Sequence, residues 1–163
     1  MTAGPSESIS LRPATAQDEG FLRFVYAESR REELDQAVWP EGLREQFLNS
    51  QFDAQASHYF EHYPDADFLV IEHESRAAGR FYVHRAPSEI RIIDIAIVPE
   101  FRGRGIGTAL LQQLLAEGQS SARIVTLHVE KFNPAQRLYQ RLGFRPAADQ
   151  GVYWLLQWPP PGS

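Results

Sequence analysis

The stretch that decides the fold reads Asp94-Ile95-Ala96-Ile97-Val98-Pro99-Glu100-Phe101-Arg102-Gly103-Arg104-Gly105-Ile106-Gly107-Thr108. It begins inside an isoleucine-rich run that predicts a strand over Glu89–Val98, the longest of the chain, closed by a proline. An amphipathic helix is predicted over Gly105–Glu117, with Ile106, Leu110 and Leu114 on one stripe. The pattern therefore places three glycines in a tight turn between the end of a strand and the start of a helix.

This glycine turn, residues 102–107, is a candidate anion site. The first N–H groups of a helix have no partner within the helix, and the helix dipole is positive there. Glycines at 103, 105 and 107 leave the backbone without Cβ atoms, so a phosphate or pyrophosphate can reach those amides. Arg102 and Arg104 add positive charge nearby. Gly107 has a second interpretation, close packing of the helix against the strand.

Two familiar phosphate-binding loops do not fit the turn. A P-loop needs Gly-Lys-Ser/Thr, and the turn contains no lysine. A dinucleotide fold needs G-x-G-x-x-G near the start of a parallel βαβ unit. Here Gly103-x-Gly105-x-Gly107 has a different spacing and lies about two-thirds along the chain. Both interpretations are excluded.

The turn resembles the signature of the GNAT N-acetyltransferase superfamily, because Arg102-x-x-Gly105-x-Gly107 matches its Arg/Gln-x-x-Gly-x-Gly/Ala pattern between a strand and a helix. A second block about 30 residues downstream is similar to the Asn…Ala…Leu-Tyr…Gly-Phe segment of that family; it comprises Asn133, Ala135, Leu138, Tyr139, Gly143 and Phe144. The interval from Asn133 to Tyr139 is one residue shorter than in many members, so Tyr139 transfers more directly. The resemblance extends from about residue 11 to 158 and is specific over 92–108 and 129–144.

The whole chain is expected to form one α/β (α+β) domain over 1–163, with a mixed, largely antiparallel central sheet and flanking helices in the order β-α-α-β-β-β-α-β-α-β-β. Predicted strands are Ser8–Arg12, Phe68–His73, Gly79–Arg85, Glu89–Val98, Ile124–Val129, Phe144–Ala147 and Val152–Trp158. Helices are predicted from Thr15 to about Arg31, from Pro40 to Pro64 as one or two segments, from Gly105 to Glu117, and from an Asn133 N-cap, with Pro134 as first helical residue, to a Gly143 C-cap. Glu74–Ala78 is the predicted hairpin turn. The ordered core is about 8–158, with flexible ends Met1–Ser6 and Pro159–Ser163.

The resemblance implies that acetyl-CoA is the co-substrate and an amine of a small molecule or peptide is the acceptor. It implies that the CoA pyrophosphate binds the turn, formed by Arg102, Gly103, Arg104, Gly105, Ile106, Gly107 and Thr108. The pantetheine arm would pair with the backbone of Ala96, Ile97 and Val98. Asn133 would touch the cofactor, or would only cap its helix. Tyr139 matches the position whose hydroxyl reaches the CoA sulfur, where a tyrosine with a pKa of about 10 can protonate the leaving thiolate.

The proton acceptor stays open among several groups. An alkylammonium has a pKa of about 10.4, so something must take its proton at neutral pH. His128 lies on the strand before the second motif, where some family members carry a glutamate base, and a histidine suits the task. Glu130 shares the strand face of His128, and Asp94 is a carboxylate in an apolar run. A chain of water molecules is the remaining candidate.

Two other functions compete with catalysis. A non-catalytic acyl-CoA-binding or regulatory module would keep the turn without needing Tyr139. An interaction protein would use the aromatic-rich segment 39–63 as a partner groove. The first helices also carry Glu28, Glu32, Glu33 and Asp35, followed by Trp39, Phe47, Phe52, His58, Tyr59 and Tyr63. These acids and rings could attract an ammonium group, or be a solvated helix end and core aromatics.

Composition narrows the partners and the compartment. A net charge of −5 argues against nucleic acid, and no apolar run approaches the ~18–20 residues of a membrane span. The polar, acidic start argues against a secretory signal. Without cysteine there is no thiolate metal site. His58 and His62 have the spacing of a helical pair, but position 59 is tyrosine and the His-Glu-x-x-His pattern is not met, so no metal is expected. Lys131 is the only lysine, which suggests a GC-rich bacterial genome, and a cytoplasmic location is expected. The family resemblance makes a homodimer a further expectation.

Overall fold

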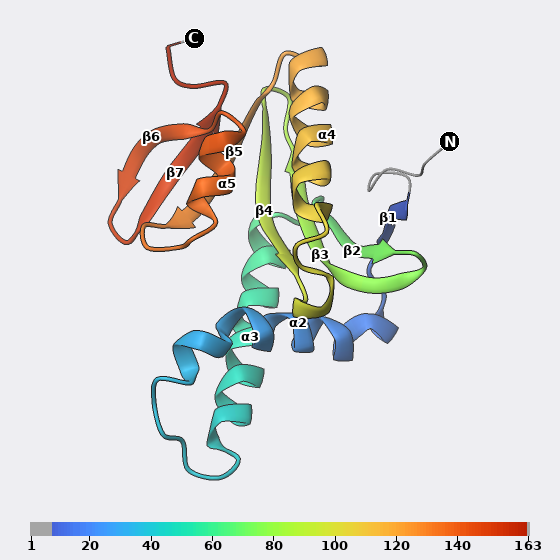
Figure 1. Cartoon of the computed structure of the whole chain (residues 1–163), viewed down its shortest axis with the longest axis vertical. Helices are drawn as coiled ribbons and strands as arrows, with labels where there is room; N and C mark the ends of the chain where they lie inside the picture. Colours follow the sequence, from blue (N-terminus) through green and yellow to red (C-terminus); the bar gives the residue numbers. More distant parts are fainter. Residues whose placement is uncertain (1–7, 163) are drawn as a thin grey trace.

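A computed structural model describes residues 8–162, so the predicted flexible segment Met1–Ser6 lies outside the described residues. The elements are β1 Ile9–Pro13, η1 Ala16–Asp18, α2 Glu19–Leu34, α3 Leu43–His62, β2 Asp67–His73, β3 Arg76–Arg85, β4 Glu89–Ile97, η2 Pro99–Phe101, α4 Ile106–Ser120, β5 Ile124–Glu130, α5 Gln136–Arg141, β6 Arg145–Gln150 and β7 Tyr153–Trp158 (Figure 1). The predicted order of strands and helices is confirmed. None of the helices within 8–162 is both long and apolar enough to cross a bilayer.

The seven strands form one sheet in the order β1-β2-β3-β4-β5-β7-β6, and every neighbouring pair is antiparallel except β4 and β5. The parallel pairing of β4 with β5 runs only from Glu89 and Ile124 to Ile92 and Leu127. Both strands continue beyond that rung without pairing to each other. The sheet therefore forks, and the β5, β6 and β7 part leaves the β1–β4 part, as Figure 1 shows.

A β-bulge in β4 lies at the point where the strands separate. Tyr82 of β3 pairs with Asp94, but the next residue, Val83, pairs with Ile92, so Ile93 is an extra residue in β4. A bulge bends its strand and increases the local twist. The bend turns the second half of β4 away from β5 and holds the fork open.

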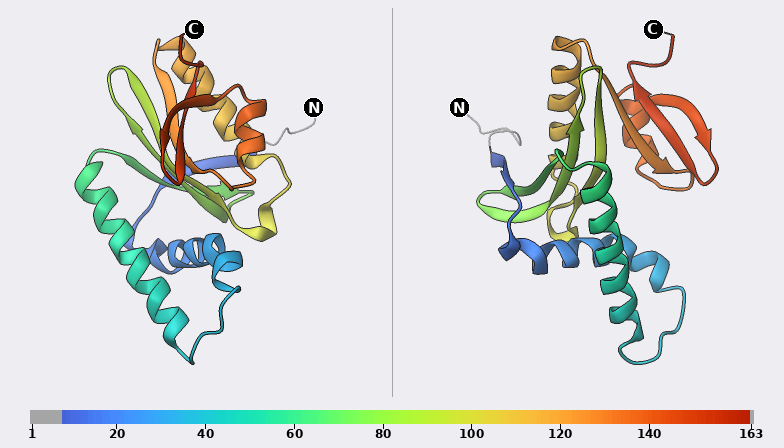
Figure 2. Two further views of the ribbon diagram at one scale, coloured as in Figure 1. Left: turned by 90° about the vertical axis from the view of Figure 1, so that its left-hand side faces the viewer. Right: turned by 180° about the vertical axis from the view of Figure 1, so that it is seen from behind.

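Helices cover both faces of the β1–β4 part. α4 lies on one face, where it buries Ile106, Leu110, Leu111, Leu114 and Leu115 in the main core. α3 lies on the opposite face (Figure 2), and it packs with α2 around a smaller cluster of Leu22, Tyr26, Phe52 and Val70. Successive residues of β3 supply both layers, because side chains alternate along a strand.

Several boundaries differ from the sequence predictions, among them the end of α2 at Leu34 and the bounds of β6. α3 is one continuous helix of 20 residues that begins after Gly42, which has a φ of 79°, and not at Pro40. The longest strand is β3 with 10 residues, not β4 with 9. β3 begins early because its hairpin turn needs only Glu74 and Ser75, whose φ values of 52° and 68° are those of a tight two-residue turn.

The start of α5 also differs from the prediction. The helix begins at Gln136, so Pro134 is not its first residue. The Oδ1 atom of Asn133 accepts a hydrogen bond from the N–H of Ala135 at 2.8 Å, and it therefore caps the turn that precedes the helix. Gly143, with a φ of 100°, follows the last helical residues as predicted.

Candidate functional site

The glycine turn presents free amides at the start of α4. Gly103 and Gly105 have φ values of 76° and 78°, a region that residues with a side chain adopt only with strain. Gly105 is the N-cap and has no side chain to cover the first turn. The first bond into the helix runs from the N–H of Ala109 to Gly105 O at 3.0 Å. The N–H groups of Ile106, Gly107 and Thr108 therefore have no partner within the helix.

Gly107 does not serve close packing, which was its alternative interpretation. A Cβ atom added there would meet nothing within 4 Å. The close-packing glycine of α4 is Gly118, where a Cβ would lie 2.9 Å from both Arg123 O and a methyl group of Val125. Open space over Gly107 is what an approaching phosphate requires.

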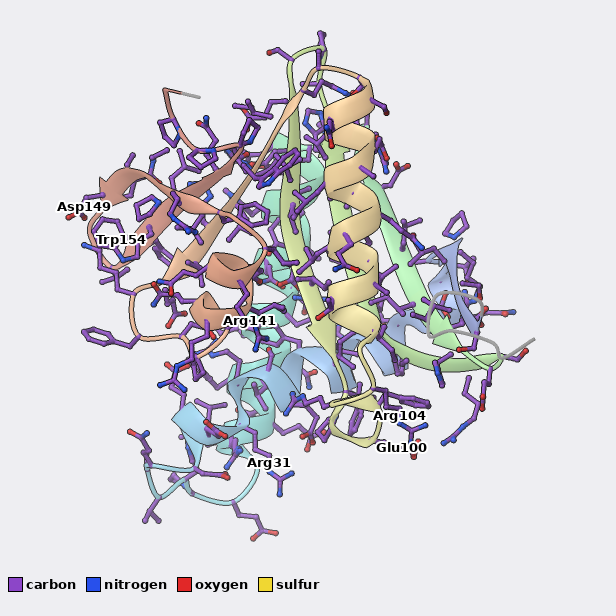
Figure 3. All side chains as sticks on the ribbon, turned by 45° about the horizontal axis from the view of Figure 1, so that its top comes forward. Arg31, Glu100, Arg104, Arg141, Asp149 and Trp154 are labelled. Atoms are coloured by element: carbon purple, nitrogen blue, oxygen red, sulfur yellow. The ribbon has the colours of Figure 1, made fainter. Side chains whose placement is uncertain are left out.

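Two arginines shape and charge the turn. The Nε atom of Arg102 donates to Ile97 O at 2.9 Å, which ties the turn to the end of β4. The guanidinium of Arg104 lies over the ring of Phe101, 5.1 Å from its centre. Figure 3 shows Arg104 close to Glu100 at this end of the sheet. The turn is therefore both held in shape and positively charged.

A cleft opens where β4 and β5 separate, and we call it the fork cleft. It has a volume of about 160 Å³ and is lined by Ile92, Ile93, Asp94, Ile95, Leu127, His128, Val129, Glu130, Asn133, Tyr139 and Tyr153. On its β4 side no strand pairs with Ile93–Ile97 across the fork. Ala96 and Ile97 lie in this part of β4, where the carbonyl oxygen of Ile97 accepts from Nε of Arg102, and their pairing with a pantetheine arm stays a prediction. Val98 differs, because its N–H already donates to Ala78 O at 2.9 Å.

Tyr139 brings its hydroxyl from α5 into the fork cleft. The residue is 8% exposed, and its ring meets Phe144 edge to face at 5.8 Å. Within residues 8–162 its hydroxyl makes no hydrogen bond. Burial raises the pKa of Tyr139 to about 12, and the charge of Asp94 adds to the effect. The phenol therefore stays protonated at neutral pH.

His128 and Glu130 share one face of β5, as the sequence predicts, while Leu127 and Val129 are buried on the other. Both side chains line the fork cleft. Although His128 is exposed at the edge of the cleft, desolvation lowers its pKa, and the nearby charge of Arg91 lowers it further. The imidazole is therefore neutral at pH 7, which is the form that can accept a proton.

Asp94 and Glu130 have different surroundings. Asp94 forms an ion pair with Arg80, whose side chain is 4% exposed, and Arg80 also donates to Oε1 of Gln55 at 2.9 Å. The carboxylate of Asp94 therefore neutralises a buried cation, which explains why a carboxylate stands in an apolar strand. Glu130 forms no ion pair with any residue in 8–162, so its charge is available to the cleft.

A larger cavity continues from the fork cleft toward α3, and we call it the outer cavity. Its volume is about 520 Å³, and it shares Ile92, Ile93, Asp94, His128, Glu130 and Tyr153 with the cleft. It adds Gln55, His58, Tyr59, Tyr63 and Arg91. Sequence reasoning missed Arg91 and Tyr153, because neither belongs to a motif and only the pairing of β5 with β4 and β7 brings them here.

The acidic and aromatic residues near the first helices do not gather at one site. Glu28, Glu32 and Asp35 line a separate groove beside Pro99 and Arg102. Glu33 pairs with Arg30, the rings of Trp39 and Phe47 stack at 5.4 Å, and Phe52 is buried in the smaller core cluster. Only His58, Tyr59 and Tyr63 of the predicted set reach the outer cavity.

The histidines of α3 do not form a metal site. The rings of His58 and His62 stack with centres 4.0 Å apart. Across the described part of the chain, no group of three or more His, Cys, Asp or Glu side chains is placed to hold a metal ion.

Known proteins resemble this chain in sequence and in fold. The sequence profile of the Acetyltransferase (GNAT) family matches residues 22–144. A candidate [ribosomal protein bS18]-alanine N-acetyltransferase of Bacillus subtilis is 33% identical over 93 residues, 56% of this chain and 62% of its own. Mycothiol acetyltransferase of Nocardia farcinica is 37% identical over 87 residues, 52% of this chain. The alignment spans only 27% of that relative.

A solved structure shows the same fold. PaiA N-acetyltransferase of Thermoplasma acidophilum, in complex with coenzyme A, has a TM-score of 0.69 over 92% of this chain and 98% of its own, at 18% identity. The family profile spans most of the chain and includes the glycine turn, the fork and Tyr139. This chain therefore belongs to the GNAT acetyltransferase family.

Proposed function

We propose that this protein transfers the acetyl group of acetyl-CoA to a primary amine by direct attack. One observation carries the proposal: β4 leads from the free amides of α4 into a cleft that holds a buried, protonated tyrosine and opens into the outer cavity. The turn, the acid and the space for an acceptor thus lie along one path through the fork.

The described residues fit a bound acetyl-CoA. The amides of Ile106, Gly107 and Thr108 and the guanidinium of Arg104 suit the pyrophosphate. The open edge of β4 at Ala96 offers backbone groups to an extended arm. When bound, acetyl-CoA supplies an activated acetyl group whose leaving group is a thiolate. In this proposal a backbone N–H of β4 in the fork polarises the carbonyl oxygen of the acetyl group.

The acceptor amine enters from the outer cavity in this proposal. An ammonium group is drawn by the unpaired carboxylate of Glu130 and by the faces of Tyr59 and Tyr63. His128 takes up its proton at an imidazole nitrogen, which frees the nitrogen lone pair for attack. After the attack, the nitrogen still carries one proton more than the amide product. Tyr139 gives its Oη proton to the departing sulfur and regains a proton from that nitrogen through water, while His128 releases its proton to solvent.

A non-catalytic acyl-CoA-binding module is the less favoured alternative. Such a module has no use for a tyrosine hydroxyl that opens to the cleft and donates to no residue within 8–162. The position of the Tyr139 hydroxyl therefore favours catalysis.

The experiment is to incubate the protein with acetyl-CoA and a panel of amines that contains polyamines, amino acids and peptide N-termini. Release of the CoA thiol and the mass of the product report transfer. Transfer to at least one amine supports the proposal. Binding of CoA, seen as a thermal shift, together with no transfer to any amine supports the alternative.

The natural acceptor, a bacterial cytoplasmic setting and a homodimer remain predictions. The names of the two relatives differ, one referring to an alanine of a ribosomal protein and the other to mycothiol, so they favour no single acceptor here. Light scattering on the purified protein tests the dimer.

A further inference from the structure

Three polar side chains join β4 to β5 directly below the fork, and we call them the Arg91 cluster: Glu89, Arg91 and Thr126. Arg91 and Thr126 face each other in the parallel pairing, one rung before it ends. The Nε atom of Arg91 donates to Oγ1 of Thr126 at 2.7 Å, and Nη2 donates to Oε2 of Glu89 at 3.0 Å. The hydroxyl of Thr126 donates to the same Glu89 oxygen at 2.5 Å.

The closed triangle of the Arg91 cluster leaves one guanidinium nitrogen for the cavity. Nη1 of Arg91 lies 3.5 Å from Nδ1 of His128 and 3.5 Å from the hydroxyl of Tyr63. Because Glu89 and Thr126 hold the other two nitrogens, Arg91 cannot turn away without losing both contacts. The guanidinium is therefore fixed against the imidazole.

This contact favours the neutral imidazole. A guanidinium N–H can only donate, so it suits Nδ1 of His128 only while that nitrogen carries no proton. A protonated ring would instead place a second positive charge beside one that is never lost.

We propose that the Arg91 cluster is a positioning unit that holds a positive charge against His128 and so keeps the imidazole unprotonated in the fork. Its use in acetyl transfer rests on the proposed function, but the coupling between Arg91 and His128 does not. Arg91 acts through His128 and is not itself a catalytic residue.

Other charged and titratable groups face His128 from the surrounding elements. Across β4 the paired Asp94 lines the same cavity, and Glu130 lies two residues along β5. α3 contributes His58 and Tyr59, its C-cap contributes Tyr63, and β7 contributes Tyr153. Among all of these, Arg91 is the group whose charge opposes protonation of His128, and Glu89 acts in the reverse direction.

The test measures the titration of His128 itself, by imidazole NMR on the protein without ligand, with the His128 signals assigned by loss in His128→Gln. Arg91→Gln removes the charge and should raise the midpoint toward the ordinary histidine pKa of about 6.5. Glu89→Gln removes the opposing negative charge but keeps an amide oxygen that can accept from Arg91 and Thr126, so Arg91 stays in place and the midpoint should fall. Arg91→Lys keeps the charge and should keep most of the depression.

A control variant guards against a general effect of losing an arginine. Arg123→Gln removes an arginine that directly precedes β5, pairs with Glu117 of α4 and lines neither cavity. It should leave the midpoint of His128 unchanged. Opposite shifts in Arg91→Gln and Glu89→Gln support the proposal, because simple loosening of the fork would move both midpoints the same way. Shifts in the same direction, or no shift in Arg91→Gln, would overturn it.

The same variants separate this inference from the proposed function. If the midpoints move as expected and the pH profile of acetyl transfer moves with them, both stand. If the midpoints move and the profile of transfer does not, the positioning of His128 by Arg91 stands, and the assignment of His128 as the proton acceptor fails.

Discussion

Replacements at Gly107 test separately the stability of the ligand-free fold and the binding of CoA, and the first replacement is alanine. A Cβ atom at this position would meet nothing within 4 Å, and Gly107 is not among the residues with positive φ. Alanine therefore costs no contact in the folded protein. It favours a helix over glycine by up to about 1 kcal/mol. We expect the variant without ligand to be as stable as the parent protein, or more stable by up to this amount.

Gly107→Ala should also leave CoA binding nearly unchanged, because the family signature admits alanine at this position. A larger side chain, as in Gly107→Leu, should weaken CoA binding, because it stands beside the free amides of the first turn of α4, where a phosphate must approach closely. A ligand at a hundredfold excess over its Kd stabilises the protein by about 2.7 kcal/mol, and a tenfold loss of affinity reduces this to about 1.4 kcal/mol. Denaturant unfolding of parent and variant, each with and without CoA, measures both effects.

Gly79→Ala is the matched control for the fold. There a Cβ would lie 2.1 Å from the carbonyl oxygen of Ala96, so β3 and β4 would have to separate. Overpacking of this kind costs about 1–3 kcal/mol without any ligand. The reasoning about Gly107 is refuted if Gly107→Ala destabilises the ligand-free protein as Gly79→Ala does, or if Gly107→Leu leaves the stabilisation by CoA intact.

Four further predictions concern the acid, the base and the N-terminal ion pair. Tyr139→Phe should lower kcat by about a hundredfold or more while the thermal shift with CoA persists, and steady-state kinetics with a working acceptor check this. Because transfer needs neutral His128, whose pKa is lowered by desolvation and Arg91, the rate should fall only as the pH drops below about 6.5, and His128→Gln should remove this acid limb. The Tyr139 pKa of about 12 predicts no loss from tyrosine ionisation up to about pH 10 in the same profile. The ion pair with Arg12 and the N–H of Thr15 hold the pKa of Asp18 well below its usual range. This carboxylate therefore stabilises the fold above about pH 3.9, and the stabilisation is lost as the pH falls. The difference in unfolding free energy between the parent and Asp18→Asn, measured by urea unfolding, should shrink in acid.

The fold was largely predictable because its signals are local. Apolar runs bounded by proline and glycine marked the strands, and the order of elements followed from them. The errors lie where long-range pairing overrides local pattern. The hairpin after β2 closes on Glu74 and Ser75 at positive φ, although neither is glycine, because β2 and β3 pair along their whole length. α3 is one continuous helix because no proline or glycine interrupts the chain between Leu43 and His62, and it starts after Gly42 because a φ of 79° is not helical.

The site was only partly predictable. The two motifs located the glycine turn and Tyr139, and strand periodicity placed His128 and Glu130 on one face. No local pattern indicated that Asp94 would be neutralised by a buried Arg80, or that Arg91 would reach His128 across the fork. Both contacts join residues far apart in sequence, so they depend on strand register and on the bulge at Ile93.

By itself the sequence determined the free amides of the turn, because glycines at 103 and 105 and the start of a helix are local features that chain geometry dictates. Only the tertiary structure decided that a cleft opens along β4 next to those amides. The cleft exists because β4 bends at its bulge while β5 follows β7. Burial and neighbouring charges keep Tyr139 protonated and His128 unprotonated. Burial and charge arise from packing between distant segments, which no single stretch of sequence contains.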